Sequence, residues 1–128
     1  MSIEEEVKRL KASTIPVNRE DVKLANGSEV TPDHKEIDPE TGLQKAYVVL
    51  SDTERAKGFV RRYRNAYRHL TCKTVTMMAH SIAETYARDP YFYSGTYCCG
   101  CRAHFPVGED GEFTWIELDD SAGPKVGT

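Results

Sequence analysis

The order of apolar and polar positions divides the chain into residues 1–45, with little regular pattern, and residues 46–128, with most of the predicted helices and strands. Residues 2–12 have apolar side chains on one face and begin with a capping-box pattern, which predicts a short helix. Residues 13–45 contain few apolar side chains and several prolines and glycines. We therefore expect an irregular or extended segment with several turns there.

The second part opens with a predicted strand and a short helix. Residues 46–50 are rich in β-forming side chains, which indicates a buried strand. Ser51 and Glu54 have the spacing of a capping box, and Gly58 can end the helix that they start. Residues 59–70 fit a helix through an aromatic stripe at every fourth position. We favour an extended strand, in which alternate side chains face the same side.

A second helix and a β-hairpin are predicted nearer the C-terminus. Residues 77–88 have an apolar face, and Asp89–Pro90 ends the helix. The segments 105–107 and 113–118 flank a Gly-Glu-Asp-Gly turn, which is typical of a hairpin. Residues 119–128 have the polar composition of a tail.

All four cysteines lie in a pattern that is typical of a zinc site. Two residues separate His69 from Cys72, and two separate Cys98 from Cys101. A turn of this spacing presents two ligand atoms to the same side, and two such turns can close a tetrahedron around one zinc ion. The glycine before Cys101 suits a tight turn. The sequence therefore predicts one structural zinc bound by these four residues, with Cys99 as a spare.

Other interpretations of this site stay open. His104 follows Cys101 by three residues, and His80 lies in the predicted second helix, so either can replace His69 as the fourth ligand. The cysteines can also be free thiols that act as small apolar side chains. Four cysteines clustered at knuckle spacing make that alternative less attractive.

A catalytic zinc is the weakest of these interpretations. Zinc deaminases combine His-x-Glu on one helix with Pro-Cys-x-x-Cys on the next. Here His80 and Glu84 are four positions apart, and no proline precedes Cys98. A hydrolase or deaminase also needs an open coordination position at the metal. The chain contains no glycine-rich phosphate loop and no kinase-type motif.

The segment 55–73 is strongly basic, although the whole chain has a net charge of −3. It contains seven basic residues and no acidic one, while the rest of the chain has ten basic and twenty acidic residues. Arginines that alternate with aromatic residues are typical of surfaces that bind single-stranded nucleic acid or acidic partners. The arginines can also pair with acidic groups of the same chain or of a second copy. The candidate partner-binding residues are Arg61, Arg62, Arg64 and Arg68.

The overall composition limits the class of protein. Apolar residues make up 39% of the 128 positions and charged residues 29%, so we expect a modest core that needs a staple. No run of apolar residues is long enough to cross a membrane, and the acidic N-terminus does not resemble a secretory signal. We therefore expect a reducing compartment, where cysteines bind metals more often than they form disulfides.

Four phrases in residues 46–128 are distinctive as a group: AYVVLSDTERAKGFVRR, IAETYARDPYFYS, YCCGCRAHFPVG and the closing KVGT. They resemble a group of small proteins encoded by bacteriophages and prophages, which carry no assigned function. The resemblance implies a metal-binding cysteine at Cys72 and a pair at Cys98 and Cys101. It also implies glycine at position 73, where this chain has lysine. It further implies an accessory protein that acts in the host cytoplasm, without implying a reaction.

These observations predict a small single domain of the α+β class. A helix lies between two zinc knuckles in a zinc-ribbon-like C-terminal part, and a C-terminal β-hairpin follows. The expected function is that of a non-enzymatic phage accessory protein that binds a host or defence component. The alternative is a nucleic-acid-binding zinc module that uses the basic segment 55–73. A zinc-dependent hydrolase or deaminase comes third, and the formation of a homo-oligomer stays open.

Overall fold

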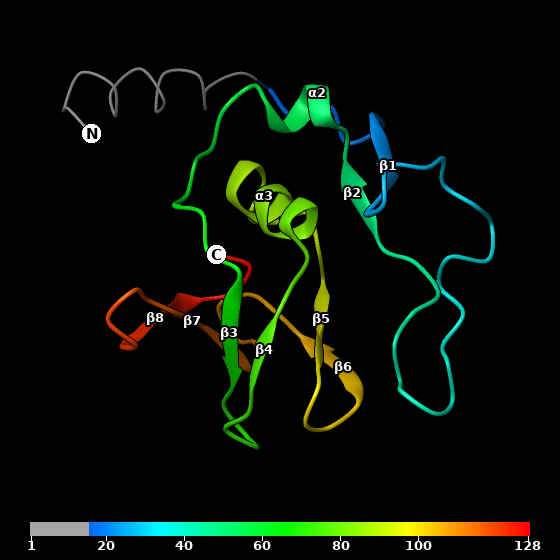
Figure 1. Cartoon of the computed structure of the whole chain (residues 1–128). Helices are drawn as coiled ribbons and strands as arrows, with labels where there is room; N and C mark the ends of the chain where they lie inside the picture. The colour runs from blue at the N-terminus through cyan, green and yellow to red at the C-terminus, as the bar shows by residue number, and fades with distance from the viewer. Residues whose placement is uncertain (1–15) are drawn as a thin grey trace, which may run out of the picture.

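The structure is a computed structural model that describes residues 16–128, and the helix predicted for residues 2–12 lies outside this part. The described residues form a small, mostly β domain with two short helices (Figure 1). No helix among them is long and apolar enough to cross a membrane. The elements are β1 (Val22–Leu24), β2 (Val48–Leu50), α2 (Asp52–Arg55), β3 (Ala66–His69), β4 (Val75–Met77), α3 (His80–Arg88), β5 (Gly95–Cys98), β6 (Ala103–Pro106), β7 (Phe113–Ile116) and β8 (Ala122–Lys125).

The strands form three antiparallel sheets. The largest has the order β4-β3-β7-β8, and two smaller sheets consist of β1 with β2 and of β5 with β6. Strand β3 is central to the large sheet, because Tyr67 lies opposite Thr76 on one side and Trp115 on the other. Figure 1 shows α3 between the large sheet and the group formed by α2, β1 and β2.

The core lies where α3 meets the large sheet. Alternate side chains of β3 and β7 are buried, and they meet Ala83 and Tyr86 from the helix. The other side of the helix is tied to the N-terminal strands by hydroxyl groups. Ser81 donates to the carbonyl of Ala25 at 3.0 Å, and Thr85 accepts from the amide of Leu50 at 3.2 Å. The helix ends at Arg88, before Asp89–Pro90, as its sequence predicts.

The predicted strand and helix after residue 45 are present. Strand β2 contains the buried Val49 and Leu50, and Ser51 caps α2 by accepting a hydrogen bond from the amide of Glu54. In a complete capping box the Glu54 carboxylate would also accept from the amide of Ser51. Among the described contacts, it accepts from the amide of Asn18 instead. That contact joins α2 to the segment before β1.

Strand β1 was not predicted, because three residues are too few to show a periodicity. It lies in the segment expected to be irregular and pairs with β2, with Lys23 opposite Val49. The favoured strand over residues 59–70 is confirmed only for β3. The predicted helix over 77–88 begins at His80, because β4 continues to Met77.

The hairpin predicted from segments 105–107 and 113–118 is wrong. Strand β6 pairs with β5, and β7 pairs with β3 and β8, so the Gly108–Gly111 turn carries the chain from one sheet to another. The turn itself is tight, with the amide of Gly111 donating to the carbonyl of Gly108 at 2.9 Å. The composition of a turn does not specify which strands it joins. The C-terminal hairpin consists of β7 and β8 instead.

The polar tail predicted for residues 119–128 is also wrong. The chain turns at Asp120, which has a φ of +66°, and continues into β8. Val126 is fully buried, and its amide donates to the carbonyl of Phe113 at 3.0 Å. A single buried valine among polar residues is too weak a signal for the sequence to indicate an element, but it is enough to attach this segment to the core.

Candidate metal centre

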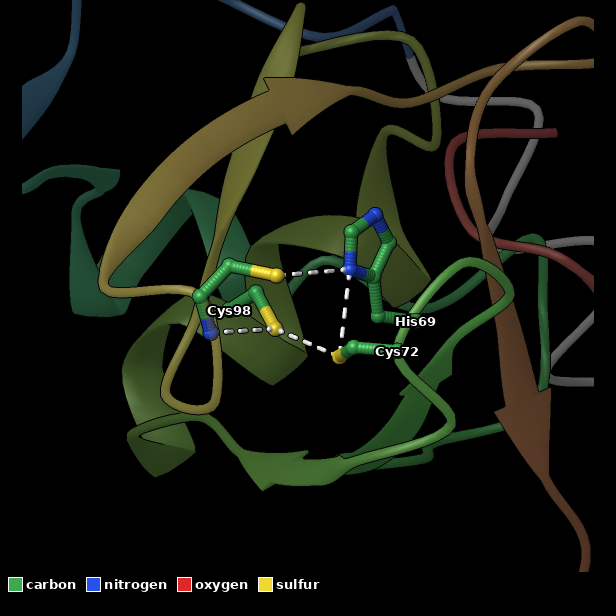
Figure 2. Close-up of side chains that lie close together, drawn as sticks. His69, Cys72 and Cys98 are labelled. Atoms are coloured by element: carbon green, nitrogen blue, oxygen red, sulfur yellow. Dashed lines mark hydrogen bonds between the residues drawn. The ribbon is translucent and has the colours of Figure 1, made fainter.

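Two β-hairpins bring the four predicted ligands together. His69 ends β3 and Cys72 lies in the turn before β4, while Cys98 ends β5 and Cys101 lies in the turn before β6. Figure 2 shows His69, Cys72 and Cys98 directed toward one another from these turns. The potential ligand atoms of all four residues lie within 4.8 Å of each other. His69 and Cys98 are buried, Cys72 is half-buried and Cys101 is exposed.

The two turns have the same backbone construction. The amide of Lys73 donates to the carbonyl of His69 at 2.8 Å, and the amide of Arg102 donates to the carbonyl of Cys98 at 2.8 Å. Lys73 has a φ of +65° and Arg102 a φ of +55°. Both values lie in the left-handed region that favours glycine. The glycine that the resemblance implies at position 73 therefore agrees with the backbone there, although this chain has lysine.

The distances between ligand atoms are close to those of a zinc tetrahedron. His69 Nδ1 lies 3.4 Å from Cys72 Sγ and 3.5 Å from Cys101 Sγ, and the sulfurs of Cys72 and Cys98 are 3.4 Å apart. Tetrahedral zinc with ordinary bond lengths places nitrogen about 3.6 Å from sulfur and two sulfurs about 3.8 Å apart. The group can therefore bind a metal such as zinc with small adjustments.

Contacts behind His69 fix the orientation of its imidazole ring. Nε2 lies 2.9 Å from Oε1 of Glu112, so Nδ1 is left to face the sulfurs. The rings of Phe105 and Phe113 stack on the imidazole at centroid distances of 4.5 and 4.8 Å. A carboxylate on the far nitrogen is the usual second partner of a metal-bound histidine, because it sets the tautomer and increases the basicity of the ligand.

The sulfur atoms also have partners from the turns. The amide of Thr74 lies 3.5 Å from Cys72 Sγ, and the amide of Cys101 lies 3.4 Å from Cys98 Sγ. The two turns touch at Gly100, where an added Cβ would lie 2.5 Å from Oγ1 of Thr74. The glycine before Cys101 is therefore required by the close contact between the two turns.

The thiols influence each other's ionisation. Hydrogen bonds from the hydroxyl and amide of Thr74 lower the pKa of Cys72 to about 6. Desolvation and the neighbouring sulfurs of Cys72 and Cys98 raise the pKa of Cys101 to about 11. Burial acts to lower the pKa of His69, but the hydrogen bonds to Glu112 and Cys72 outweigh it and raise the pKa. Thiolates this close repel one another, so ionisation of all three cysteines would be favoured by a cation bound between them.

The structure does not bring the other candidate ligands to this group. His104 Nε2 lies 2.8 Å from the hydroxyl of Tyr47, and His80 lies on the exposed side of α3. Cys99 points to β4, where its sulfur contacts Oγ1 of Thr76 at 3.3 Å. Among the described residues, the metal-binding group consists of His69 with three cysteines.

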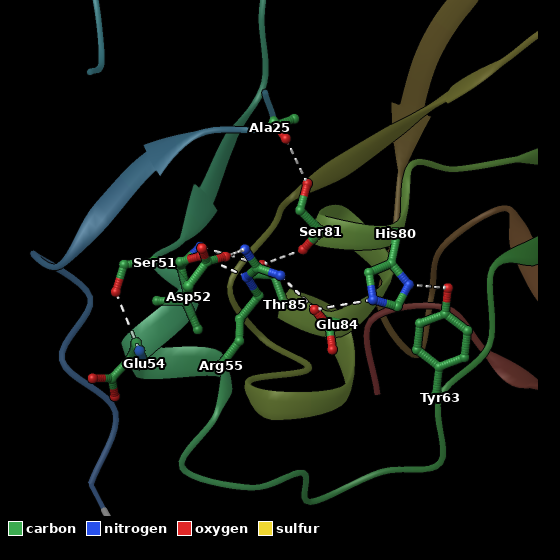
Figure 3. A network of polar contacts seen from close by, with 11 residues as sticks. Ala25, Ser51, Asp52, Glu54, Arg55, Tyr63, His80, Ser81, Glu84 and Thr85 are labelled. Carbon is green, nitrogen blue, oxygen red and sulfur yellow. Dashed lines mark hydrogen bonds and ion pairs between the residues drawn. The ribbon is translucent and has the colours of Figure 1, made fainter. Parts of the chain in front are cut away.

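Glu84, the candidate general base of a deaminase, belongs to a separate polar network. Figure 3 shows it between His80 and Arg55. His80 Nε2 lies 3.3 Å from Glu84 Oε1, and Arg55 forms an ion pair with the same carboxylate. Arg55 also pairs with Asp52 and donates to the carbonyl of Leu50. This network joins α2 to α3 and contains none of the metal-binding residues.

The basic segment is partly neutralised within the molecule. Arg62 and Arg64 both pair with Glu117, at 3.4 and 2.7 Å, but the Arg62 side chain is 67% exposed and that of Arg64 only 15%. Arg61 is exposed, and its Nε donates to the carbonyl of Thr128. Arg68 is half-buried on β3, where its Nε has no hydrogen-bond partner among the described residues. The four predicted partner-binding arginines therefore do not form one uniform surface.

Sequence spacing predicted the four residues that the structure brings together, but it missed the residues that support them. Glu112, Phe105 and Phe113 are distant from His69 in the chain, and no motif connects them to it. Strand pairing is what brings them to His69: β3 pairs with β7, which places His69 opposite Phe113.

No family model, curated protein or solved structure matches this chain. The evidence for function therefore comes from the arrangement of these residues.

Proposed function

We propose that this protein is a zinc-stapled binding protein of the phage accessory type, which acts on a host or defence component through contact and not through catalysis. The observation that carries the proposal is the complete ligand set. His69, Cys72, Cys98 and Cys101 provide four soft donors, which is the number that structural zinc uses. A catalytic zinc keeps one position for water or substrate.

The arrangement of the hairpins supports a zinc-ribbon-like organisation of residues 66–106. Each hairpin would contribute two ligands from its turn. The two turns have the same type of backbone hydrogen bond, and each contains one residue in the left-handed conformation. In a zinc ribbon, two knuckles of this kind hold one ion between them. The bound ion would join β3–β4 to β5–β6, two hairpins that belong to different sheets.

The exposed arginines support a contact surface for an acidic or phosphate-bearing partner. Arg61 and Arg62 are the best candidates, because both are exposed and, within residues 16–128, a single carboxylate, that of Glu117, pairs with both Arg62 and Arg64. The resemblance of residues 46–128 to phage proteins supports a host or defence protein as the partner.

A nucleic-acid-binding zinc module is the second candidate. The alternation of Arg61, Arg62 and Arg64 with Tyr63, which is 36% exposed, favours it. The ion pairs of Arg55 and Lys57 with acidic residues of the chain count against it, because they remove two of the seven basic groups from the surface charge. Binding to single-stranded nucleic acid that weakens steeply with salt would favour this second function.

The metal part of the proposal is tested by elemental analysis and X-ray absorption of protein purified without added metal. We expect one zinc per chain, with three sulfur ligands and one nitrogen ligand. Zinc with an ordered water in its first shell would favour the hydrolase or deaminase. In that case Glu84→Gln, which keeps the shape of the side chain, would abolish activity.

The contact surface is tested by charge reversal in the zinc-loaded protein. We expect Arg61→Glu with Arg62→Glu to lose the partner captured from infected host cells, while the zinc content and melting temperature stay unchanged. The matched control is Lys35→Glu with Lys45→Glu, which changes the net charge equally at exposed positions outside the segment. Retained capture by the arginine variant, or equal loss in both variants, would rule out this surface.

A further inference from the structure

The large sheet has an outer face, which is the side turned away from the core residues Tyr67, Phe113 and Trp115. Side chains alternate along a strand, so the positions between these core residues lie on the outer face. In register across the four strands they form two rows, an apolar row of Met77, Ala66, Ile116 and Ala122 and a basic row of Val75, Arg68, Thr114 and Lys125.

The apolar row crosses all four strands of the sheet. Met77 is 68% exposed, and Val75, its neighbour on β4, is 40% exposed. Ala122 is exposed, and Ala66 and Ile116 are half-buried. An antiparallel sheet with one face in water usually has polar side chains on that face, so these apolar positions are unusual. An apolar stripe of this kind is typical of a surface that another element covers.

Arg68 and Lys125 give the second row its positive charge. The ion pairs of residues 16–128 include neither side chain. Lys125 Nζ donates to the carbonyl of Gly111 at 2.7 Å, but Arg68 Nε is buried and has no hydrogen-bond partner in the described part of the chain. A half-buried guanidinium without a partner destabilises the protein, and a carboxylate from outside removes that cost.

We propose that the outer face binds an amphipathic helix of another protein, in which carboxylates flank a stripe of apolar side chains. The stripe lies on Met77, Ile116 and Val75, and a flanking carboxylate accepts hydrogen bonds from Arg68. A helix is an element that commonly covers the face of a sheet. The proposal adds a second contact surface to that of Arg61 and Arg62, and its test does not depend on theirs.

Charge complementarity favours an acidic partner over a second copy of this chain. The two rows contain no acidic residue, so two copies that meet through this face would bring their basic rows into one interface without a counter-charge from either row. Like charges that face each other across an interface oppose binding, whereas carboxylates at the edge of an apolar helix stripe match the basic row.

Three synthetic helical peptides test the proposal on the intact, zinc-loaded protein. Each has leucine at every third or fourth position, and the flanking positions are glutamate, glutamine or lysine. We expect NMR titrations to show the tightest binding for the glutamate peptide, about three- to tenfold weaker binding for the glutamine peptide and none for the lysine peptide. The methyl signals of Met77, Val75 and Ile116 should shift. Absence of saturable binding by the glutamate peptide, or shifts confined to another surface, would overturn the proposal.

Met77→Thr with Val75→Thr tests the apolar part of the surface. The double change removes apolar area and keeps two side chains that favour β-strands. We expect the glutamate peptide to bind about tenfold more weakly, while the zinc content and melting temperature stay unchanged because both positions are exposed. Unchanged affinity would rule out this face. Light scattering that shows a wild-type dimer, dissociated by the double change, would assign the face to a second copy and contradict the proposal.

Arg68→Met tests the charged part, because it keeps much of the length of the side chain and removes the guanidinium. We expect this variant to bind the glutamate and glutamine peptides equally. The matched control is Lys35→Met, which removes a cation at an exposed position outside the large sheet and should keep the preference for glutamate. The wild-type preference in Arg68→Met, or the same loss of preference in both variants, would show that Arg68 does not recognise a carboxylate.

Discussion

Two polar centres among the described residues differ in how their charges are balanced. In the metal-binding group, three thiols and the imidazole of His69 face one another. In the other centre, Glu54 and Arg88 have fully buried side chains that lie 3.4 Å apart. Lys57 approaches the same carboxylate at 2.8 Å, and the amide of Asn18 donates to it at 2.9 Å. A metal ion bound in the first centre would offset thiolate charge from outside the chain, whereas the second contains its own opposite charges.

The comparison separates two ways of stabilising a small domain with a modest core. A metal contributes folding free energy from outside the chain, so the stability of its centre depends on metal concentration and on chelators. A buried ion pair must offset its own desolvation, so it adds little net stability when intact and costs much when one partner is removed. Removal of the metal should therefore destabilise the first centre, and removal of one charged partner should destabilise the second.

The largest expected effect is the loss of the metal centre in Cys98→Ala. We expect no bound zinc and loss of fixed tertiary structure in residues 69–118, because zinc binding in structural sites contributes roughly 10–16 kcal/mol in small zinc-finger peptides. Zinc analysis with near-UV circular dichroism measures both. Chelator treatment of the wild-type protein should have the same result. A wild-type protein that stays folded without metal would show that zinc is not required to stabilise the fold.

Cys99→Ser is the control for this experiment. Cys99 contacts Thr76 and the carbonyl of Val75, and serine can keep hydrogen bonds to both. We expect the variant to retain one zinc and its near-UV spectrum.

The next largest effect is expected from Glu54→Gln. Removing the carboxylate leaves Arg88 with less compensation in a fully buried position, and breaking such a pair costs about 3–5 kcal/mol. Denaturant unfolding measures the loss, while the zinc content should stay at one per chain. Replacing both partners, as in Glu54→Gln with Arg88→Met, should cost less than the sum of the two single changes.

Acid should remove the contribution of Glu54 in a defined direction. Burial acts to raise the pKa of Glu54, but Lys57, Asn18 and Arg88 outweigh it, so the folded pKa lies below the ordinary value of 4.5. A depressed folded pKa gives stability that is present above the unfolded pKa and is lost as the pH falls through the folded one. The unfolding free energies of wild type and Glu54→Gln should therefore converge as the pH falls from the ordinary value of 4.5 through the lower folded pKa. A constant difference across that range would mean that the carboxylate charge is not the cause.

The same two centres show which features the sequence could predict and which it could not. The four residues of the candidate metal centre could be predicted because their spacing is local: each pair lies within one turn, and this spacing of cysteine and histidine is typical of metal sites. Glu54 was identified only as a capping residue, since its partner Arg88 is 34 positions away in another helix. Nothing in either local pattern indicates that the two side chains meet.

Strand pairing failed in the sequence analysis for the same reason. The core strand β3 and the helix α3 follow from alternation and helical periodicity within their own residues. The pairing of β7 with β3 depends on side chains more than 40 residues apart, as with Tyr67 and Trp115. Local turn composition therefore suggested a hairpin between 105–107 and 113–118 that the fold does not contain. The support of His69 by Glu112 was missed with it.

A smaller effect is expected where the two metal-binding turns touch. In Gly100→Ala the new Cβ would lie 2.5 Å from the hydroxyl oxygen of Thr74, so one turn must move. We expect a loss of about 1–3 kcal/mol, as for other overpacked contacts, and weaker retention of zinc against a chelator. Gly27→Ala is a useful control, because an added Cβ meets nothing there within 4 Å and only the positive φ is penalised. A smaller loss at Gly100 than at Gly27 would contradict the contact between the turns.

The smallest effect is expected from replacing the left-handed residue of each turn with glycine. Lys73 and Arg102 each follow a metal-binding cysteine with a positive φ, a conformation that costs a residue with a Cβ roughly 1–2 kcal/mol. Glycine removes that strain but adds about 0.5–1 kcal/mol of entropy to the unfolded chain. Lys73→Gly and Arg102→Gly should therefore each stabilise the zinc-loaded protein by about 0.5 kcal/mol, measured by denaturant unfolding. Lys35→Gly, at an exposed position without a positive φ, should destabilise it slightly. Because the two turns share the same type of hydrogen bond and both have a left-handed residue, gains of similar size at positions 73 and 102 are expected, and a gain at only one would show that the turns are not equivalent.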